Sequence, residues 1–139
     1  MRGMKFVLAP VLLLLLQACT PSGLDAATGE RVFKQCASCH QVGANARAGF
    51  GPQLNGLFGR RAGSTPDFVY SDAMKASGIV WDERSLAAFV RDPHKVVPET
   101  KMRFWGIGDE NQIKALLAYL RTFQGVDSTA APPATPTAP

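Results

Sequence analysis

Residues 36–40, Cys-Ala-Ser-Cys-His, constrain the fold of this chain more than any other stretch. Two thiols about one helical turn apart can add to the two vinyl groups of a haem, and each addition forms a thioether. The imidazole of His40, which follows directly, can then turn to the iron as an axial ligand. Cys-x-x-Cys-His is the pattern of covalent c-type haem attachment, and it predicts a cofactor around which the rest of the chain folds.

Three other uses of Cys36 and Cys39 compete with this interpretation. A thioredoxin-like redox pair requires a preceding strand in a βαβ pattern, whereas the residues before Cys36 have the spacing of an amphipathic helix. A zinc site requires four ligands, and His94 is the one plausible addition. A structural disulfide would leave His40 without a role. Haem attachment is therefore the preferred hypothesis.

Helix signals dominate the region from 25 to 125, and we expect an all-α fold. Aspartates at positions 25, 82 and 109 can cap helices over 26–35, 83–92 and 110–124, and a shorter helix is expected over 71–77. Apolar residues recur at helical spacing in the three longer segments. Pro93 ends the third helix, and Gly125 follows the last one.

A long segment over 41–68 separates the first two expected helices and contains six glycines and two prolines. A loop of this length is uncommon inside a compact domain and usually encloses something functional. About 100 residues with few helices can build only a thin hydrophobic core. A buried cofactor would supply the missing apolar centre.

The iron of a haem has two axial positions, and Met74, His94 and Met102 are the candidates for the second one. Met102 lies in an irregular stretch between Pro98 and Gly106, which can present a side chain while both its ends are held. Met74 lies in the expected short helix and fits a packing role better. His94 lies in a polar turn and is expected on the surface. Met102 is preferred, and a haem protein with a labile sixth ligand, acting as a peroxidase or gas sensor, is the alternative.

The two ends of the chain differ in composition from its centre. Arg2 and Lys5 precede an apolar run over 6–16, which is too short to cross a bilayer comfortably and is typical of a secretory signal over 1–18. Residues 16–19 resemble the lipobox of bacterial lipoproteins, in which the cysteine, here Cys19, is lipidated and becomes the mature N-terminus. We expect a linker over 19–24, the compact domain over 25–125 and a disordered Pro/Ala/Thr-rich tail over 126–139.

These features predict an exported protein on the periplasmic face of a bacterial membrane, held there by its lipid anchor. Ordinary signal cleavage would instead leave it soluble in the periplasm. The net charge of +4 includes Arg2 and Lys5, and the rest of the chain has 13 basic against 11 acidic residues, a net of +2. This excludes the strongly basic surface of a nucleic-acid-binding protein, although a mild excess can help to steer an acidic partner.

Five motifs follow one another between residues 25 and 122: GERVFKQCASCHQV, GPQLNGLFGRRAG, YSDAMKASGIVW, VPETKM and LLAYLRT. The series resembles the class I cytochromes c of mitochondria and bacteria. The resemblance implies helices and long loops around one covalently bound haem c, with His40 and Met102 as axial ligands. It also implies a one-electron carrier rather than an enzyme. The donor would be a quinol-oxidising complex and the acceptor a terminal oxidase or reductase, in a respiratory or related chain.

The same resemblance implies roles for further residues. The first helix would cross the last one through Gly29, Phe33, Leu116 and Tyr119. The carbonyl of Pro52 would accept a hydrogen bond from His40 and orient its ring. Two haem propionates need hydrogen-bond donors inside a small protein, and the residues that the resemblance assigns to them are Arg60, Tyr70, Trp81 and Thr100.

Two positions depart from the family pattern. Glu99 stands where the family usually has glycine, in a turn that favours a positive φ at that residue. Phe89 stands where many members have a tyrosine hydroxyl near the methionine sulfur, and its absence should shift the reduction potential.

Electrons are expected to enter and leave at the exposed thioether edge of the haem. Lys34, Lys101 and Arg103 flank the motifs nearest that edge and are candidates for docking acidic partners. Trp105 beside them is either a docking aromatic or, more simply, a packing residue.

Overall fold

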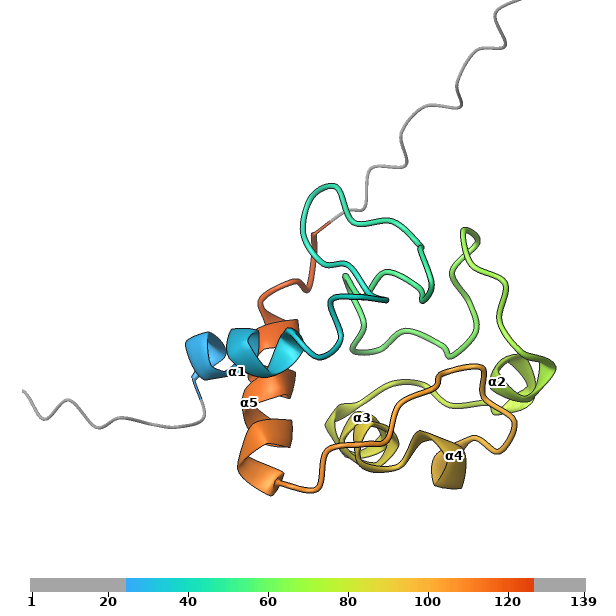
Figure 1. Ribbon diagram of the computed structural model, residues 1–139. Helices are drawn as coiled ribbons and strands as arrows, with labels where there is room; N and C mark the ends of the chain where they lie inside the picture. The colour runs from blue at the N-terminus through green and yellow to red at the C-terminus, as the bar shows by residue number, and fades with distance from the viewer. Residues whose placement is uncertain (1–24, 127–139) are drawn as a thin grey trace, which may run out of the picture.

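The computed structural model describes residues 25–126, and its secondary structure there is helical apart from one isolated β-bridge between Arg61 and Val80. In chain order the helices are α1 (Ala26–Phe33), α2 (Asp72–Ala76), α3 (Glu83–Arg91), α4 (Pro93–Val96) and α5 (Glu110–Arg121). Long loops connect α1 to α2 and α4 to α5 (Figure 1). The prediction of an all-α fold is confirmed.

Each helix begins after a side chain that caps its first turn. The capping oxygen accepts a hydrogen bond from the backbone N–H three residues later, which satisfies one of the free donors of the first turn. The capping residues are Asp25, Ser71, Asp82, Asp92 and Asp109. The short helix α4 was not predicted. It begins at Pro93, because proline has no N–H to satisfy at a first helical position.

Two helices end two or more residues earlier than expected. We expected the first to reach Gln35, but α1 ends at Phe33 and a series of turns continues to Cys39. The last was expected to reach residue 124, but α5 ends at Arg121. Directly after each helix the backbone N–H groups bond to carbonyls three residues back, those of Gln35 and Cys36 after α1 and those of residues 122–124 after α5, so the chain tightens as it leaves the helix.

Helices α1 and α5 cross at close range, and their contact is the most extensive between any two described helices (Figure 1). Gly29 permits this approach, because a Cβ built there would lie 2.6 Å from the Cβ of Tyr119. The ring centroids of Phe33 and Tyr119 lie 5.4 Å apart beside the crossing. The crossing that the family resemblance implied is therefore present.

Side-chain hydrogen bonds hold the glycine-rich segment against the rest of the molecule. Asn55 is buried, accepts the Gly43 N–H at 2.8 Å and donates to the Gly43 carbonyl at 2.8 Å. The side chain of Gln124 bonds both the N–H and the carbonyl of Phe58, at 3.1 and 3.0 Å. These contacts fix a loop without regular structure at a set distance from α5.

Candidate functional site

A cavity of about 420 Å³ lies among the loop after α1, helix α2 and the residues that follow it, helices α3 and α5, and the segment between α4 and α5. This volume is in the usual range for a small-molecule site. Residues from all of these segments line it, and they include every residue that the sequence assigned to a haem: Cys36, Cys39, His40, Pro52, Arg60, Tyr70, Trp81, Thr100 and Met102.

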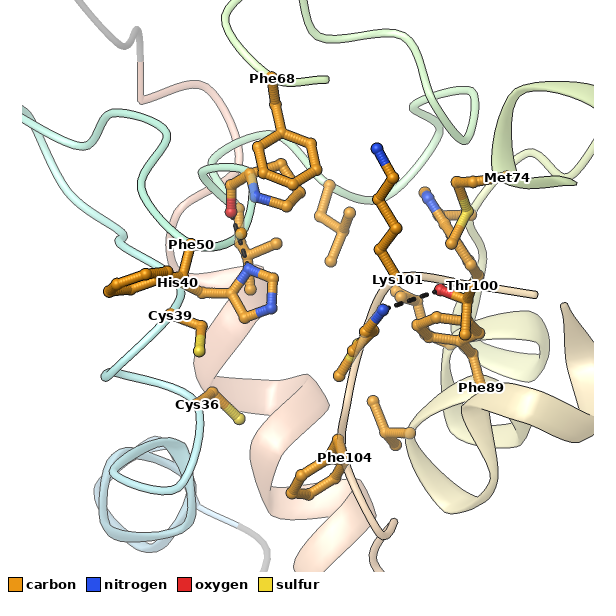
Figure 2. Close-up of a pocket in the computed structure, with 18 of the residues that line it drawn as sticks. Cys36, Cys39, His40, Phe50, Phe68, Met74, Phe89, Thr100, Lys101 and Phe104 are labelled. Atoms are coloured by element: carbon orange, nitrogen blue, oxygen red, sulfur yellow. Dashed lines mark hydrogen bonds between the residues drawn. The ribbon is translucent and has the colours of Figure 1, made fainter. Parts of the chain in front are cut away.

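A hydrogen bond to the backbone orients the His40 imidazole. Its Nδ1–H donates to the Pro52 carbonyl at 2.8 Å, as the family resemblance implied, and Nε2 is left facing the cavity (Figure 2). Burial holds the pKa of His40 below its usual value, although the Pro52 hydrogen bond opposes this, and the charge of Arg60 lowers it further. A neutral imidazole with one nitrogen donating and the other free is the form that binds a metal.

Gly51 is a further part of this arrangement that no sequence motif indicated. It is buried, and a Cβ built on it would lie 2.5 Å from Cε1 and 2.8 Å from Nδ1 of His40. The imidazole therefore occupies space that any larger residue at 51 would need. The residues around Gly51 do not distinguish it from the neighbouring glycines, because His40, whose ring it contacts, lies eleven positions earlier in the chain.

Cys36 and Cys39 lie at the edge of the cavity as free thiols, Cys36 half-buried and Cys39 exposed. They do not form the disulfide that the sequence left open. Burial raises the pKa of Cys36 to about 11, and the neighbouring Cys39 adds to the rise. In a reactive redox pair the thiol pKa is lowered rather than raised. In addition, helix α1 rather than a strand precedes Cys36 and Cys39. Within residues 25–126 no three His, Cys, Asp or Glu side chains form a metal-binding group, which removes support for the zinc alternative.

The opposite wall of the cavity carries Met74, Phe89 and Thr100, across from His40 and the two cysteines (Figure 2). Met102 lines the cavity from the same segment as Thr100, and its backbone N–H donates to the Thr100 hydroxyl at 3.3 Å. Met74 is buried, as a packing residue should be, but it also lines the cavity. The structure thus brings both candidate methionines to one site.

His94, the third candidate ligand, is exposed in α4 and does not line this cavity. Its expected surface position is confirmed. Phe89 is buried with its ring centroid 5.1 Å from that of Trp81, so the position that departs from the family pattern is an apolar part of the cavity wall.

Arg60 has a structural role that the sequence did not reveal. Its two terminal nitrogens each donate to a loop carbonyl at 3.0 Å, one of Asn55 and one of Gln53. No carboxylate within residues 25–126 lies at ion-pair distance from this half-buried guanidinium, and burial lowers its pKa. A partly buried cation that forms no direct ion pair favours an anionic group nearby. Tyr70 also faces the cavity, and its hydroxyl is hydrogen-bonded to the Thr65 hydroxyl at 2.7 Å.

These residues fit a haem. The walls are largely aliphatic and aromatic, which suits a flat apolar macrocycle, and the Arg60 guanidinium, which has no ion pair within residues 25–126, suits its carboxylates. Two thiols, a neutral imidazole and a thioether lie around the same space. This donor set matches the covalent attachment and axial ligation of a c-type haem.

Comparison with known proteins shows the family of this chain. A model of the cytochrome c family matches residues 26–124. Cytochrome c2 of Blastochloris viridis is 50% identical over 99 residues, which cover 71% of this chain and 78% of that protein. This chain belongs to the cytochrome c family. Cytochrome c-550 of Bradyrhizobium diazoefficiens is 46% identical over 98 residues, covering 70% of this chain and 72% of that protein. The structure of cytochrome cH from Methylobacterium extorquens superposes with a TM-score of 0.67 at 42% identity, over 70% of this chain and 98% of that one.

Family membership confirms the predicted fold, cofactor and type of activity. The chain is a class I c-type cytochrome that carries one covalently bound haem c. It is an electron-transfer protein rather than an enzyme, and its partners are redox proteins.

The exposure of Trp105 on the surface of this cytochrome differs from the expected packing role. Lys101 and Arg103 are exposed residues on the rim of the cavity, and Lys34 is exposed but does not line it. The interpretation of Trp105 as a packing residue is wrong, because its side chain is fully exposed. Among residues 25–126, none of the helices has the length and apolar character needed to cross a membrane.

Proposed function

We propose that this cytochrome is a membrane-tethered one-electron carrier in which Cys36 and Cys39 bind the haem and His40 and Met102 are its axial ligands. The observation that carries the proposal is the His40 imidazole. It is oriented by Pro52 toward a cavity to which the opposite segment contributes Met102. When bound, haem c supplies a reversible one-electron change between ferric and ferrous iron.

The protein's own residues set the conditions for that change. Pro52 and Gly51 hold the His40 ring in one tautomer and one position. Thr100 accepts the Met102 N–H and restrains the segment that presents the thioether. With both side chains as ligands, no coordination position is left for a substrate. The apolar walls keep water away from the centre of the cavity, and Arg60, Tyr70, Trp81 and Thr100 are the residues assigned to the propionates.

Carbon monoxide binding to the reduced protein tests the ligand assignment. We expect slow or negligible binding by the wild type at neutral pH and rapid binding by Met102→Leu, which keeps the side-chain volume but removes the sulfur. Met74→Leu is the matched control, since Met74 lines the same cavity, and it should still exclude carbon monoxide. If Met74→Leu opens the site and Met102→Leu does not, the ligand is Met74. Rapid stoichiometric binding by the wild type would favour the peroxidase or gas-sensor alternative.

The proposed donor is a quinol-oxidising complex and the proposed acceptor a terminal oxidase or reductase. Family membership in the electron-transferring cytochromes c supports partners of this kind. A reconstituted chain containing quinol, both complexes and this cytochrome should consume oxygen only when the cytochrome is present. Oxygen uptake that does not depend on the added cytochrome would contradict these partners.

The tether is proposed from the sequence, because Cys19, the signal over 1–18, the linker over 19–24 and nearly all of the tail over 126–139 lie outside the described residues. Lipidation of Cys19 would hold the haem domain at the periplasmic face of a membrane, near its partners. Multiple acyl chains anchor firmly, whereas a single chain gives marginal binding. We expect the wild type in the membrane fraction and Cys19→Ser in the soluble periplasmic fraction. A Cys19→Ser variant that stays on the membrane would exclude a lipid anchor at this residue.

A further inference from the structure

The segment that carries Met102 has no regular structure of its own. Residues 102–109 form neither helix nor strand, and they lead toward the first turn of α5 (Figure 1). The Met102 N–H bonds to Thr100 of the same segment, and the Lys101 side chain donates to the Val69 carbonyl at 3.3 Å on the surface. A segment of this kind can open locally while the helices stay folded. Its position therefore depends also on how its two ends are held.

The two ends of the segment meet at the last turn of α3. Ile107 is buried, and its N–H donates to the Val90 carbonyl at 2.9 Å. Gly106 packs on the next residue, Arg91, so closely that an added Cβ would lie 2.8 Å from the Arg91 carbonyl carbon. Val90 also lines the haem cavity. Backbone contacts thus close the loop of chain that presents Met102, and they do so beside the cavity.

The side chains of Arg91 and Glu110 form an ion pair at the same place. Arg91 is the last residue of α3, and Glu110 is the first residue of α5, nineteen positions later in the chain. Each charge also suits its own helix end, since a cation is favoured in the last turn of a helix and an anion in the first. The pair therefore bridges the points at which the chain leaves α3 and enters α5.

A second ion pair joins the same two helices at their other ends. Glu83, the first residue of α3, accepts from Arg121, the last residue of α5, at 2.8 Å. The Glu83 and Glu110 side chains are 65% and 63% exposed. The two pairs therefore match in charge, helix-end position and exposure. Of the two, the Arg91–Glu110 pair alone lies where the Met102 segment is closed.

We propose that the Arg91–Glu110 ion pair positions the axial ligand, because it keeps the Met102 segment closed and limits how often the thioether leaves the iron. The inference rests on the proposed ligation by Met102. A molecule from solvent can reach that coordination position only when the segment opens. An exposed ion pair adds little to global stability, but opening one segment is a small step in free energy. The same contribution therefore changes the frequency of opening several-fold.

Imidazole binding to the oxidised protein measures this opening. At slightly alkaline pH imidazole is uncharged, and at saturating imidazole the observed rate reaches a plateau set by opening of the segment. We expect Glu110→Gln and Arg91→Gln each to raise the plateau rate about two- to fivefold. The double variant should raise it no further, because the two residues act as one pair. Glu83→Gln is the matched control and should leave the plateau rate unchanged.

Two further readouts separate this role from a general effect on stability. Salt screens an exposed ion pair, so high salt should raise the plateau rate of the wild type and leave that of the double variant unchanged. Hydrogen exchange of the Ile107 amide reports the closed backbone contact without involving the iron. It should be faster in Glu110→Gln than in the wild type and unchanged in Glu83→Gln.

The outcomes distinguish the ion pair from the ligand assignment. Equal plateau rates for the wild type and Glu110→Gln would overturn the positioning role and leave Met102 as the ligand. An equal increase in Glu83→Gln would assign the effect to general loosening of α3 against α5, which would also overturn the role. If the wild type binds imidazole without a plateau and as fast as Met102→Leu, the ligand assignment itself fails, and this inference fails with it.

Discussion

Glu99 occupies a backbone position that favours glycine. The Thr100 N–H donates to the Val97 carbonyl at 3.1 Å, and Pro98 and Glu99 are the two central residues of the turn. Glu99 has a φ of 65°, the value that a type II turn requires at its third residue. A side chain there costs about 1–2 kcal/mol, because Cβ approaches the following carbonyl oxygen. The segment that presents Met102 therefore contains local strain.

Replacement of Glu99 by glycine should relieve this strain. We expect Glu99→Gly to raise the free energy of unfolding by about 1 kcal/mol, since part of the gain is offset by the greater freedom of glycine in the unfolded chain. Denaturant unfolding of the oxidised protein measures the change. Glu99→Ala removes the charge but keeps a Cβ, so it should bring no such gain. Equal stabilisation by both variants would attribute the effect to charge.

A methyl group at position 51 should displace the His40 ring, because the two cannot occupy the same space. We expect Gly51→Ala to destabilise the protein by about 1–3 kcal/mol and to perturb the axial-ligand bands of the visible spectrum. Gly49→Ala is the control, as its Cβ would meet nothing closer than the Cys39 carbonyl oxygen at 3.8 Å. An unchanged spectrum in Gly51→Ala would show that the ring tolerates the added atom.

Helices α1 and α5 form the main helix–helix contact of the described chain. α5 is amphipathic: its polar residues face outward, and its buried residues include Ile113, Leu116, Leu117 and Leu120. The same helix contributes Leu116 and Leu120 to the haem cavity, so the crossing with α1 sets the position of one cavity wall. A change at the crossing should therefore affect both stability and the haem site.

Gly29→Ala tests this coupling. The new Cβ would lie 2.6 Å from the Tyr119 Cβ and 2.7 Å from the Ala115 carbonyl carbon, so the helices must separate. We expect a loss of about 1–3 kcal/mol or more, together with a shift in the haem spectrum. Gly108→Ala serves as the control, because no atom lies within 4 Å of its added Cβ and its φ is not positive. A Gly29→Ala protein as stable as Gly108→Ala would contradict the close approach.

At the scale of the whole molecule, the cofactor is part of the hydrophobic core. The cavity of about 420 Å³ lies between the packed helices and the long loops. The walls are largely aliphatic and aromatic, so without the haem they would face water and the burial that stabilises a core would be incomplete. The total stability of a small domain is only about 5–15 kcal/mol, so this loss matters. The fold and the haem therefore depend on each other.

A variant unable to form the thioethers should lose cooperative folding. We expect Cys36→Ser combined with Cys39→Ser to show reduced helical circular dichroism, poor dispersion of its amide NMR signals and no sharp unfolding transition. Cys19→Ser removes a cysteine outside the described domain and should keep the native transition. A double variant that unfolds cooperatively at the wild-type midpoint would mean that the chain folds without its covalent cofactor.

Local features of this protein could be predicted, because their causes lie within a few residues of each other. The pair Cys36 and Cys39, three positions apart and followed by His40, already implied the cofactor. Aspartates in capping positions, Asp25, Asp82 and Asp109, implied where α1, α3 and α5 begin. The ends of α1 and α5 were less predictable, because tightened turns continue the chain beyond each helix.

The sequence by itself therefore determined the cofactor, the all-α class and the family, which depend on covalent chemistry and on helical spacing. Only the tertiary structure decided that both Met74 and Met102 face the cavity, that Arg60 bonds loop carbonyls and that Trp105 lies outside. Each of these depends on contacts between segments far apart in the chain. Such contacts follow from packing around a shared centre, and no local pattern encodes them.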